Sequence, residues 1–323
     1  MSAAVVDALR RRMRLDVVDL RTADYNRADL LPTFLQAGAD VHGSHGLFYW
    51  LRARGSGHVL ATDDAAMVLA WRRDVGRLVA FRPAGQLDSV VGLLEAAGAA
   101  AAATDPTLPF VVRYCGSGLA SRLRELGWSD LGDAWQPGAP SDDETHPEVI
   151  VTAPVVEFPP GQRYKPVRQA IACHSDRYTY TCAPTPLGIG EASFVERDNA
   201  RVRRYDEHET SFNTAMLASL GARRHDWLTY HYLTHDQRLA GFAITANVTG
   251  IAHGYYLSTR DVPRLTTYLL WLIYLQQRRA GAWALNLGGS EAASLYAFKT
   301  RTFPDHFVQA TQVLQRPPIP RPR

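Results

Sequence analysis

Residues Trp283 to Pro304, which read WALNLGGSEAASLYAFKTRTFP, decide the fold of this chain. The apolar residues from Ala282 to Leu287 predict a strand, and the two glycines after them predict a turn. Ser290 then stands in the N-cap position of a helix predicted over Glu291 to Lys299. A strand, a glycine turn and a capped helix in this order are typical of a domain built on a mixed α/β sheet.

The same stretch presents chemistry where the strand passes into the helix. Glycine lets a ligand or another backbone approach closely. The first N–H groups of a helix have no partner within it and favour an anionic or carbonyl oxygen. We therefore take Asn286, Gly289, Ser290 and Lys299 as candidate catalytic residues. The plainer interpretation is a tight turn followed by a solvated lysine.

Strand and helix patterns surround this motif in the second half of the chain. Alternating apolar residues predict the strands, and apolar residues at helical spacing predict the helices. The longest helix ends at Gly281, a residue suited to a left-handed C-cap. The predicted strands cover Val149–Phe158, Tyr178–Ala183, Trp227–Leu233, Leu239–Asn247, Ile251–Ser258 and His306–Gln315. The helices predicted before the motif cover Tyr164–His174, Tyr205–Leu220 and Val262–Ala280, of which the last is the longest.

The first half repeats this plan with different residues, so the predicted class is α/β of the α+β kind, with a mixed sheet in each half. Between the halves, Gln136 to Pro147 is polar, carries prolines and has no period, which is typical of a linker or a long surface loop. A chain of 323 residues is long for one domain and natural for two.

We predict domains over residues 1–147 and 148–323. The first is expected to be mainly architectural, because it has no lysine and no glycine-capped strand–helix junction like Leu287 to Ser290. The second is expected to carry the chemistry.

Composition excludes several classes of protein. No apolar run reaches the ~20 residues of a membrane span. Three widely spaced cysteines without a CxxC pair fit reduced thiols, so we expect a cytoplasmic protein. We also expect a monomer or weak dimer and no membrane partner. His231 and His235 would share a strand face ~13 Å apart, which argues against a metal site. A net charge of +3 does not by itself indicate a nucleic-acid binder.

Lysine is rare in this chain, because only Lys165 and Lys299 among its 35 basic residues are lysine. Where arginine is the usual cation, a remaining lysine can mark a place that needs a compact ammonium, and chance is the alternative. Lys165 lies between Arg163 and Arg168 in the basic stretch PGQRYKPVRQAIAC, residues 160–173. Both lysines therefore fall within segments that other signals single out.

The sequence N-L-G-G-S followed by L-x-x-F-K and F-P resembles the C-terminal signature of the Fem-type peptidoglycan-bridge aminoacyltransferases. It is also similar to the soluble domain of the lysyl-phosphatidylglycerol synthases, whose basic opening stretch resembles residues 160–173. The resemblance covers roughly Pro154 to Thr311, about half the chain. It implies two tandem acetyltransferase-like (GNAT-like) domains and an enzyme, an acyltransferase, that takes an amino acid from aminoacyl-tRNA.

Two departures from these families, and one from the acetyl-CoA enzymes of the same fold, narrow the expected donor and acceptor. The chain has no heptad run for the coiled-coil arm of the Fem enzymes, and it has no membrane domain like that of the lipid synthases. It resembles instead the free-standing tRNA-dependent transferases of antibiotic biosynthesis, which implies a small-molecule amine, hydroxylamine or hydroxyl as acceptor. The junction Ser258 to Leu265, STRDVPRL, lacks the glycines with which acetyl-CoA enzymes bind pyrophosphate. We therefore expect aminoacyl-tRNA as co-substrate and no cofactor.

The resemblance implies a role for each residue of the glycine-turn motif. Lys299 would stabilise the oxyanion that forms on the ester carbonyl, or hold the terminal ribose or phosphate. The backbone N–H groups of Gly289 and Ser290 would assist it, and Asn286 ends the strand beside them.

The remaining candidates are expected to bind substrate or tRNA. The basic stretch would bind the acceptor stem or an anionic part of the acceptor. A base is less clearly indicated, and the departing ribose oxygen can take the proton instead. These binding candidates are Arg163, Lys165, Arg168, Asp236, His253 and Tyr255, of which the last three are also the candidates for a base.

Two other functions fit the same sequence. One is an acyltransferase that uses an acyl thioester and an amino-acid-like acceptor. The other is a tandem fold without catalysis that acts as a binding or assembly protein. Turnover that survives complete digestion of tRNA would favour the thioester-dependent acyltransferase. Absence of turnover with any donor would favour the binding or assembly protein.

Overall fold

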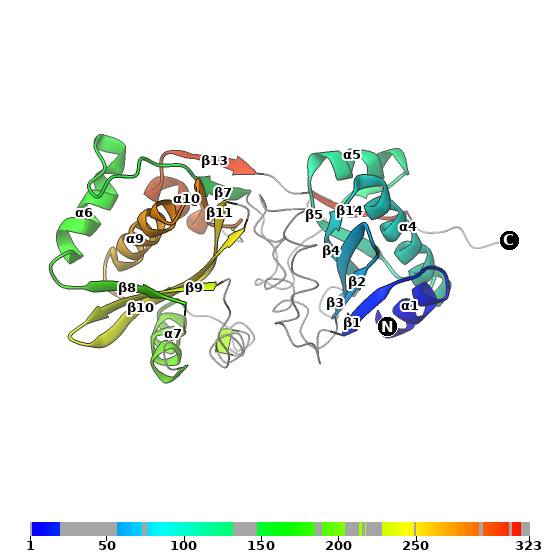
Figure 1. Ribbon diagram of the computed structural model, residues 1–323, viewed down its shortest axis with the longest axis horizontal. Helices are drawn as coiled ribbons and strands as arrows, with labels where there is room; N and C mark the ends of the chain where they lie inside the picture. Colours follow the sequence, from blue (N-terminus) through cyan, green and yellow to red (C-terminus); the bar gives the residue numbers. More distant parts are fainter. Residues whose placement is uncertain are drawn as a thin grey trace. The chain divides into compact units, whose positions relative to one another are not determined.

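The computed structural model describes residues 2–19, 57–72, 76–131, 147–184, 189–203, 213–214, 217, 228–248, 250–290, 293–309 and 312–317. The chain divides into two compact units, the first formed by residues 1–147 with 309–323 and the second by residues 148–308. Each unit contains a seven-stranded sheet with helices packed on it (Figure 1). The predicted class, α+β with a mixed sheet in each half, is confirmed. Apart from Pro147, the predicted linker lies outside the described residues.

The sheet of the first unit has the strand order β1-β2-β3-β4-β5-β14-β6. β4 and β5 are parallel, and α4 supplies the crossover that a parallel pair requires. The other described pairs are antiparallel. The elements are α1 (Ser2–Arg10), β1 (Asp16–Asp19), β2 (Gly57–Ala61), β3 (Ala65–Arg72), β4 (Arg77–Gly85), α4 (Leu87–Thr104), β5 (Phe110–Cys115), α5 (Ser117–Glu125), β6 (Ser129–Asp130) and β14 (Gln312–Gln315).

By length and composition α4 could cross a membrane, with a mean hydropathy of 1.3 over 18 residues. In the structure it is the central helix of the first core. Leu93, Leu94 and Ala97 are fully buried there, together with Leu9 of α1 and Met67 of β3. Packing of this apolar face accounts for the composition of α4, because a buried core helix needs the same residues as a membrane span.

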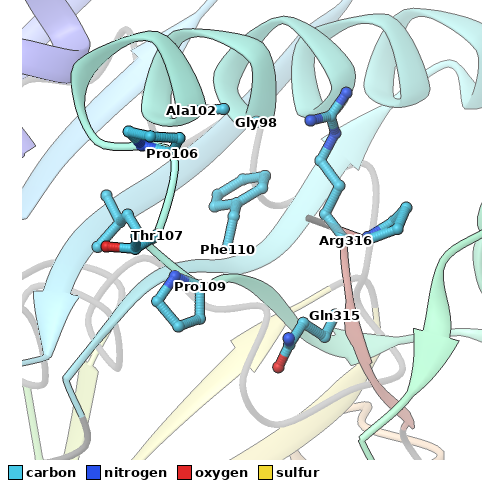
Figure 2. A pocket seen from close by; sticks show the side chains of 10 residues that line it. Gly98, Ala102, Pro106, Thr107, Pro109, Phe110, Gln315 and Arg316 are labelled. Atoms are coloured by element: carbon cyan, nitrogen blue, oxygen red, sulfur yellow. The ribbon is translucent and has the colours of Figure 1, made fainter. Parts of the chain in front are cut away.

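A pocket opens beside the C-terminal half of α4, where Phe110 and Arg316 face the helix (Figure 2). Arg316 donates a hydrogen bond to Glu95 at 3.0 Å, and Glu95 also accepts one from Trp128 Nε1 at 2.6 Å. Gly98 makes room for this arginine, because a Cβ at position 98 would overlap Cδ of Arg316. The cation in the pocket wall is therefore neutralised by a carboxylate of its own unit.

The sheet of the second unit has the strand order β13-β7-β12-β11-β10-β9-β8. β11 and β12 are parallel, whereas the registers of β8, β9, β10 and β11 and of β7 with β12 are antiparallel. The elements are β7 (Glu148–Val151), the 3₁₀ turn η3 (Gln162–Tyr164), α6 (Lys165–His174), β8 (Thr179–Ala183), α7 (Ile189–Arg203), β9 (Leu228–His235), β10 (Arg238–Val248), β11 (Ile251–Thr259), α9 (Leu265–Arg279), β12 (Ala284–Asn286), α10 (Ala293–Thr302) and β13 (His306–Gln309).

Helices cover both faces of the second sheet. α9 and α6 pack together on one face, and α7 packs against β10 and β11 on the opposite face (Figure 1). The core on the α9 side contains Trp271 and Tyr274 of α9 together with Ala252 of β11 and Leu285 of β12. Because side chains alternate along a strand, the neighbours of Ala252 and Leu285 point to the α7 side.

The end of the chain departs from the predicted domain bounds. The alternation over His306 to Gln315 predicts one last strand within a second domain that runs to residue 323. The structure has two strands instead, with β13 in the second sheet and β14 between β5 and β6 in the first. Leu314 is fully buried in the first core. The prediction was wrong because alternation identifies a strand but not the sheet that it joins.

We predict that Leu314→Ala lowers the free energy of unfolding by about 2–5 kcal/mol, because it empties a fully buried position. Val308→Ala in β13 is the control, since its side chain is 47% exposed, and it should cost about 0.5 kcal/mol or less. Urea unfolding followed by circular dichroism measures both variants. Equal losses would contradict the place of β14 in the first core.

Candidate active site

The second sheet opens between β11 and β12. The ladder between these parallel strands has three pairs and stops at His253 and Asn286. β12 ends there, whereas β11 continues to Thr259. An opening at the carboxyl ends of parallel strands is where α/β sheets commonly bind ligands.

A β-bulge lies at the same place in β11. Gly254 and Tyr256 face neighbouring residues of β10, Thr245 and Ile244, so Tyr255 is the extra residue. A bulge bends its strand and increases the local twist. The bulge therefore marks the point where β11 leaves β12.

Asn286 fixes the turn that follows β12. Its side chain is fully buried, and its Oδ1 accepts a hydrogen bond from the Gly288 N–H at 2.7 Å. Its Nδ2 donates to Oε2 of Glu148 at 2.9 Å. Gly288 has a positive φ of 68°, a conformation that costs glycine little and other residues more. The first glycine of the motif is therefore required by the shape of the turn.

Lys299 holds the same turn from α10. Its Nζ donates to the carbonyl oxygen of Gly288 at 3.2 Å and to that of Gly289 at 2.5 Å. The lysine is only 9% exposed, so its charge is largely removed from water. A buried ammonium is costly unless its protons are satisfied, and the two carbonyl oxygens serve that need. The plainer interpretation of the motif, a tight turn followed by a solvated lysine, is therefore excluded.

This contact sets the direction of two peptide groups. In a trans peptide the C=O and N–H point in opposite directions. Because the carbonyls of Gly288 and Gly289 point to Lys299, the N–H groups of Gly289 and Ser290 point away from it. Within the described part of the chain, the Gly289 N–H donates no hydrogen bond. The Gly289 N–H is thus a donor on the side away from the ammonium, and the Ser290 N–H points the same way.

His253 and Tyr255 lie at the opening. His253 is 1% exposed and pairs in register with Asn286, so both side chains point to the α7 side of the sheet. The His253 and Tyr255 rings are stacked, with centroids 6.4 Å apart. The structure therefore brings these two candidates together with the glycine turn, although they are distant from it in sequence.

Asp236, the third candidate for a base, does not lie with them, so its position gives that role no support. It lies in the hairpin turn between β9 and β10 with a positive φ of 47° and a side chain that is 86% exposed. Arg238, just after that turn, is eight residues along β10 from Ala246, which pairs with His253. At the rise of a strand this separation is roughly 26 Å. The sequence alone could not show this distance, because it does not reveal at which end of the strands Asp236 and His253 lie.

The basic stretch is mostly engaged within the second unit. Arg163 forms an ion pair with Asp305 at 2.5 Å, and Tyr164 also donates to Asp305 at 2.7 Å. Arg168 donates to the carbonyl oxygens of Pro159 and Gly161. Lys165 is exposed at the first residue of α6. Of the three predicted anion-binding side chains, two therefore brace the chain and Lys165 is turned to solvent.

Burial decides the protonation state of His231, one of the two histidines predicted to share a strand face. Its Nδ1 lies 2.7 Å from the Tyr180 hydroxyl, and its Nε2 lies 2.8 Å from Thr245 Oγ1. Burial lowers the pKa of His231 to about 3, so the ring is neutral near pH 7. Within the described ranges no three His, Cys, Asp or Glu side chains gather in a way that could hold a metal ion.

Sequence reasoning missed two buried carboxylates. Glu148, at the start of β7, is 1% exposed and bonded to Asn286. Glu196, on α7, is also 1% exposed. A glutamate that follows a polar linker, or one on a helix rich in charge, is usually solvated. Neither residue carried a local signal that distinguished it from a surface acid.

The first unit contains a strand–glycine–helix junction, a feature that the first domain was expected to lack. β5 is followed directly by Gly116, which is the N-cap residue of α5. Its φ is −66°, unlike the positive φ of Gly288. Arg122 and Arg124 of α5 form exposed ion pairs with Glu125 and Asp130. The first unit thus repeats the strand–glycine–helix order without a buried lysine beneath the turn.

These features define the fold as two compact units in tandem, each with a mixed seven-stranded sheet. Solved structures share it. The C-terminal domain of a putative lysylphosphatidylglycerol synthetase from Agrobacterium fabrum has a TM-score of 0.58 and 17% identity, with 88% of each chain covered. L-PGS from Bacillus licheniformis has a TM-score of 0.60 and 15% identity, covering 89% of this chain and 91% of that one.

FemX has a TM-score of 0.65 and 9% identity, with 94% of this chain and 97% of that chain covered. Identities this low show a common fold alone. No protein-family model matches the sequence, and no curated protein matches it. The predicted resemblance to the Fem-type and lysyl-phosphatidylglycerol proteins is confirmed at the level of the fold.

We predict that Asn286→Asp destabilises the chain by about 1–3 kcal/mol at pH 8, because it replaces the donor to Glu148 with a second carboxylate. Like charges raise the pKa of the new carboxyl pair in the folded state, so the loss should shrink as the pH falls below that raised pKa. Asn247→Asp is the control, since Asn247 is exposed and its Oδ1 accepts from the Gly250 N–H. Unfolding in urea at pH 8 and pH 5 measures both, and a pH-independent loss would contradict the pairing.

Proposed function

We propose that the chain is an acyltransferase that moves an amino acid from aminoacyl-tRNA to a small-molecule amine, hydroxylamine or hydroxyl. The observation that carries the proposal is the turn from Asn286 to Ser290, held by the Lys299 ammonium at the opening of the sheet. The common fold with L-PGS and FemX supports the same kind of reaction. A cytoplasmic location and a place in specialised metabolism, such as antibiotic biosynthesis, belong to the proposal.

The reaction needs no covalent enzyme intermediate, because the ester of an amino acid is already activated. The nucleophile of the acceptor attacks the ester carbonyl carbon, and the carbonyl oxygen takes up negative charge. The N–H groups of Gly289 and Ser290 would donate to that oxygen. The bond to the ribose oxygen then breaks, and the ribose leaves as a hydroxyl after taking a proton.

Lys299 would act mainly through the turn. Its ammonium already donates to two carbonyl oxygens, so it fixes and polarises the peptide groups whose N–H ends face the other way. This arrangement is preorganised, because the donors need no movement when the oxyanion forms. We therefore propose a positioning and electrostatic role for Lys299, with Gly289 and Ser290 as the groups that contact the substrate.

His253 is the strongest candidate for the proton acceptor. It pairs in register with Asn286 and lies at the end of the ladder, whereas Asp236 is remote. Tyr255 stacks on the His253 ring at the bulge and would orient it or contact the acceptor. Transfer of the proton to the departing ribose oxygen remains the alternative.

The first unit has an architectural role in this proposal, and the exposed Lys165 has a role in RNA binding. Lys165 begins α6 and is turned to solvent, which suits a phosphate contact. Arg163 is 63% exposed despite its ion pair with Asp305 and would add to the positive surface.

The loop between β11 and α9 disfavours acyl-CoA as donor. A pyrophosphate there needs several free N–H groups. Pro263 has none, and those of Val262 and Leu265 donate to the carbonyls of Arg260 and Val262. His174 Nε2 lies 2.9 Å from the Pro263 carbonyl oxygen, which pins the loop further.

We predict that Lys299→Ala and Lys299→Arg each lower kcat by roughly 100- to 1,000-fold, because the oxyanion donors lose their orientation. Arginine should not restore turnover, since the larger planar guanidinium does not fit a site that encloses one ammonium. Steady-state kinetics measures the loss, with circular dichroism to show that the fold persists.

Arg301→Ala is the matched control for Lys299, because Arg301 is an exposed cation two residues along the same helix. It should leave kcat unchanged. Near-normal turnover in both Lys299 variants would remove Lys299 from the site and leave only the likeness of fold.

We predict that complete digestion of tRNA abolishes transfer and that acyl-CoA does not restore it. The logarithm of affinity for aminoacyl-tRNA should fall with the logarithm of salt concentration by ~0.7–0.9 per neutralised phosphate. Lys165→Ala should reduce that slope by about one contact, whereas Arg177→Ala, an exposed cation beyond the other end of α6, should not. Transfer that persists with acyl-CoA after digestion would favour the thioester-dependent alternative.

A further inference from the structure

α7 presents a carboxylate to the sheet. Helical spacing places Ala192, Val195, Glu196, Asn199 and Ala200 on its buried side. That side packs against β10 and β11. The buried side of a surface helix is ordinarily apolar, so a glutamate in the middle of this one requires an explanation.

Among the described residues, only one of the two carboxylate oxygens of Glu196 has a hydrogen-bond partner. Its Oε1 accepts a hydrogen bond from Asn213 Nδ2 at 2.8 Å. Its Oε2 is shielded from solvent and has no hydrogen-bond partner among the described residues. The neighbouring arginines are directed elsewhere, because Arg197 donates to the Ser193 carbonyl and Arg201 to Asp198.

A structural role alone does not require this carboxylate. The hydrogen bond to Asn213 uses one oxygen and no charge, so a glutamine would make it equally well. Leaving the second oxygen of an acid buried without a donor costs free energy in the unliganded protein. Such a group is explained when a cation binds to it during function.

The sheet face beneath α7 is also the face of the candidate active site. His253 and Asn286 point to this side, opposite the core that contains Ala252 and Leu285. Arg260, at the end of β11, lies over the Phe194 ring of α7 at 5.3 Å from its centroid. α7 therefore lies on the same face and against the same strand that lines the opening.

We propose that Glu196 binds a primary ammonium group of a substrate, namely the α-ammonium of the aminoacyl donor. The choice of ligand rests on the proposed aminoacyl transfer. An ammonium donates up to three hydrogen bonds, and the unpaired Oε2 offers it a charged acceptor. An amine acceptor carries the same chemistry, so the two sources must be separated by experiment.

Amino-acid methyl esters are suitable probes, because they keep the α-ammonium and the ester but lack the tRNA. We expect at least one ester of the proteinogenic set to bind the full chain in isothermal titration calorimetry. Its N-acetylated counterpart, which has no ammonium, should not bind. Absence of binding by every ester at millimolar concentration, or equal binding of the N-acetylated form, would overturn the proposal.

Glu196→Gln keeps the shape and the acceptor for Asn213 but removes the charge. It should weaken binding of the ester by about 10- to 100-fold. Without ligand its melting temperature should equal or exceed that of the parent chain, because an unpaired buried charge is removed. Glu191→Gln is the matched control, since it removes an exposed charge from the same helix. Equal affinities of the parent chain and Glu196→Gln would overturn the proposal.

Competition with intact aminoacyl-tRNA separates the two sources of the ammonium. Competition by aminoacyl-tRNA, and not by its N-acetylated form, supports the donor as the source. Equal competition by both forms overturns that choice. If ester binding depends on Glu196 but transfer survives digestion of tRNA, the proposed function fails and the ammonium site stands. If transfer requires tRNA but Glu196→Gln binds esters normally, only the site fails.

Discussion

The buried ammonium of Lys299 is the interaction on which the candidate active site depends. Removed from water, it needs oxygen acceptors, and the carbonyls of Gly288 and Gly289 supply them. The same contact fixes the turn after β12, because Asn286 holds the Gly288 N–H from the other side. A turn bound at both its carbonyls and its first N–H has little freedom left. Its outward N–H groups are therefore fixed before any substrate arrives.

The second sheet separates stability from chemistry by its two faces. On the α9 side, Trp271, Tyr274 and Phe303 form an aromatic core with ring centroids about 6 Å apart. On the α7 side, the buried residues include Glu148, Glu196, His253 and Asn286. A polar face of this kind is expensive to bury, and it persists because the opposite core supplies the stability. The buried polar groups of the second unit thus gather on the face that carries the candidate active site.

Local signals in the sequence singled out the glycine-turn motif of this candidate site, but they could not predict the contacts between segments that are distant in sequence. The glycine turn, Ser290 and Lys299 lie within one strand–turn–helix pattern, so the sequence singled them out together, but it did not predict that the Lys299 ammonium contacts the turn. α7 was missed because Glu196 and Asn199 interrupt the apolar period on its buried side. The helix predicted instead over Tyr205 to Leu220 is described only at residues 213, 214 and 217. The pairing of Arg163 with Asp305, like the place of β14, joins distant segments that no local pattern connects.

The two units allow an internal comparison, because each passes from one strand of its parallel pair through a glycine into a helix. In the first, Gly116 has an ordinary φ and the cations of α5 pair with surface acids, where solvent screens them. In the second, Gly288 requires a positive φ, and the cation of α10 is buried beneath the turn. The fold supplies the junction in both cases, and only the second junction carries a charge held out of water. Since a charge in such surroundings acts far more strongly than a screened one, the chemistry is expected in the second unit.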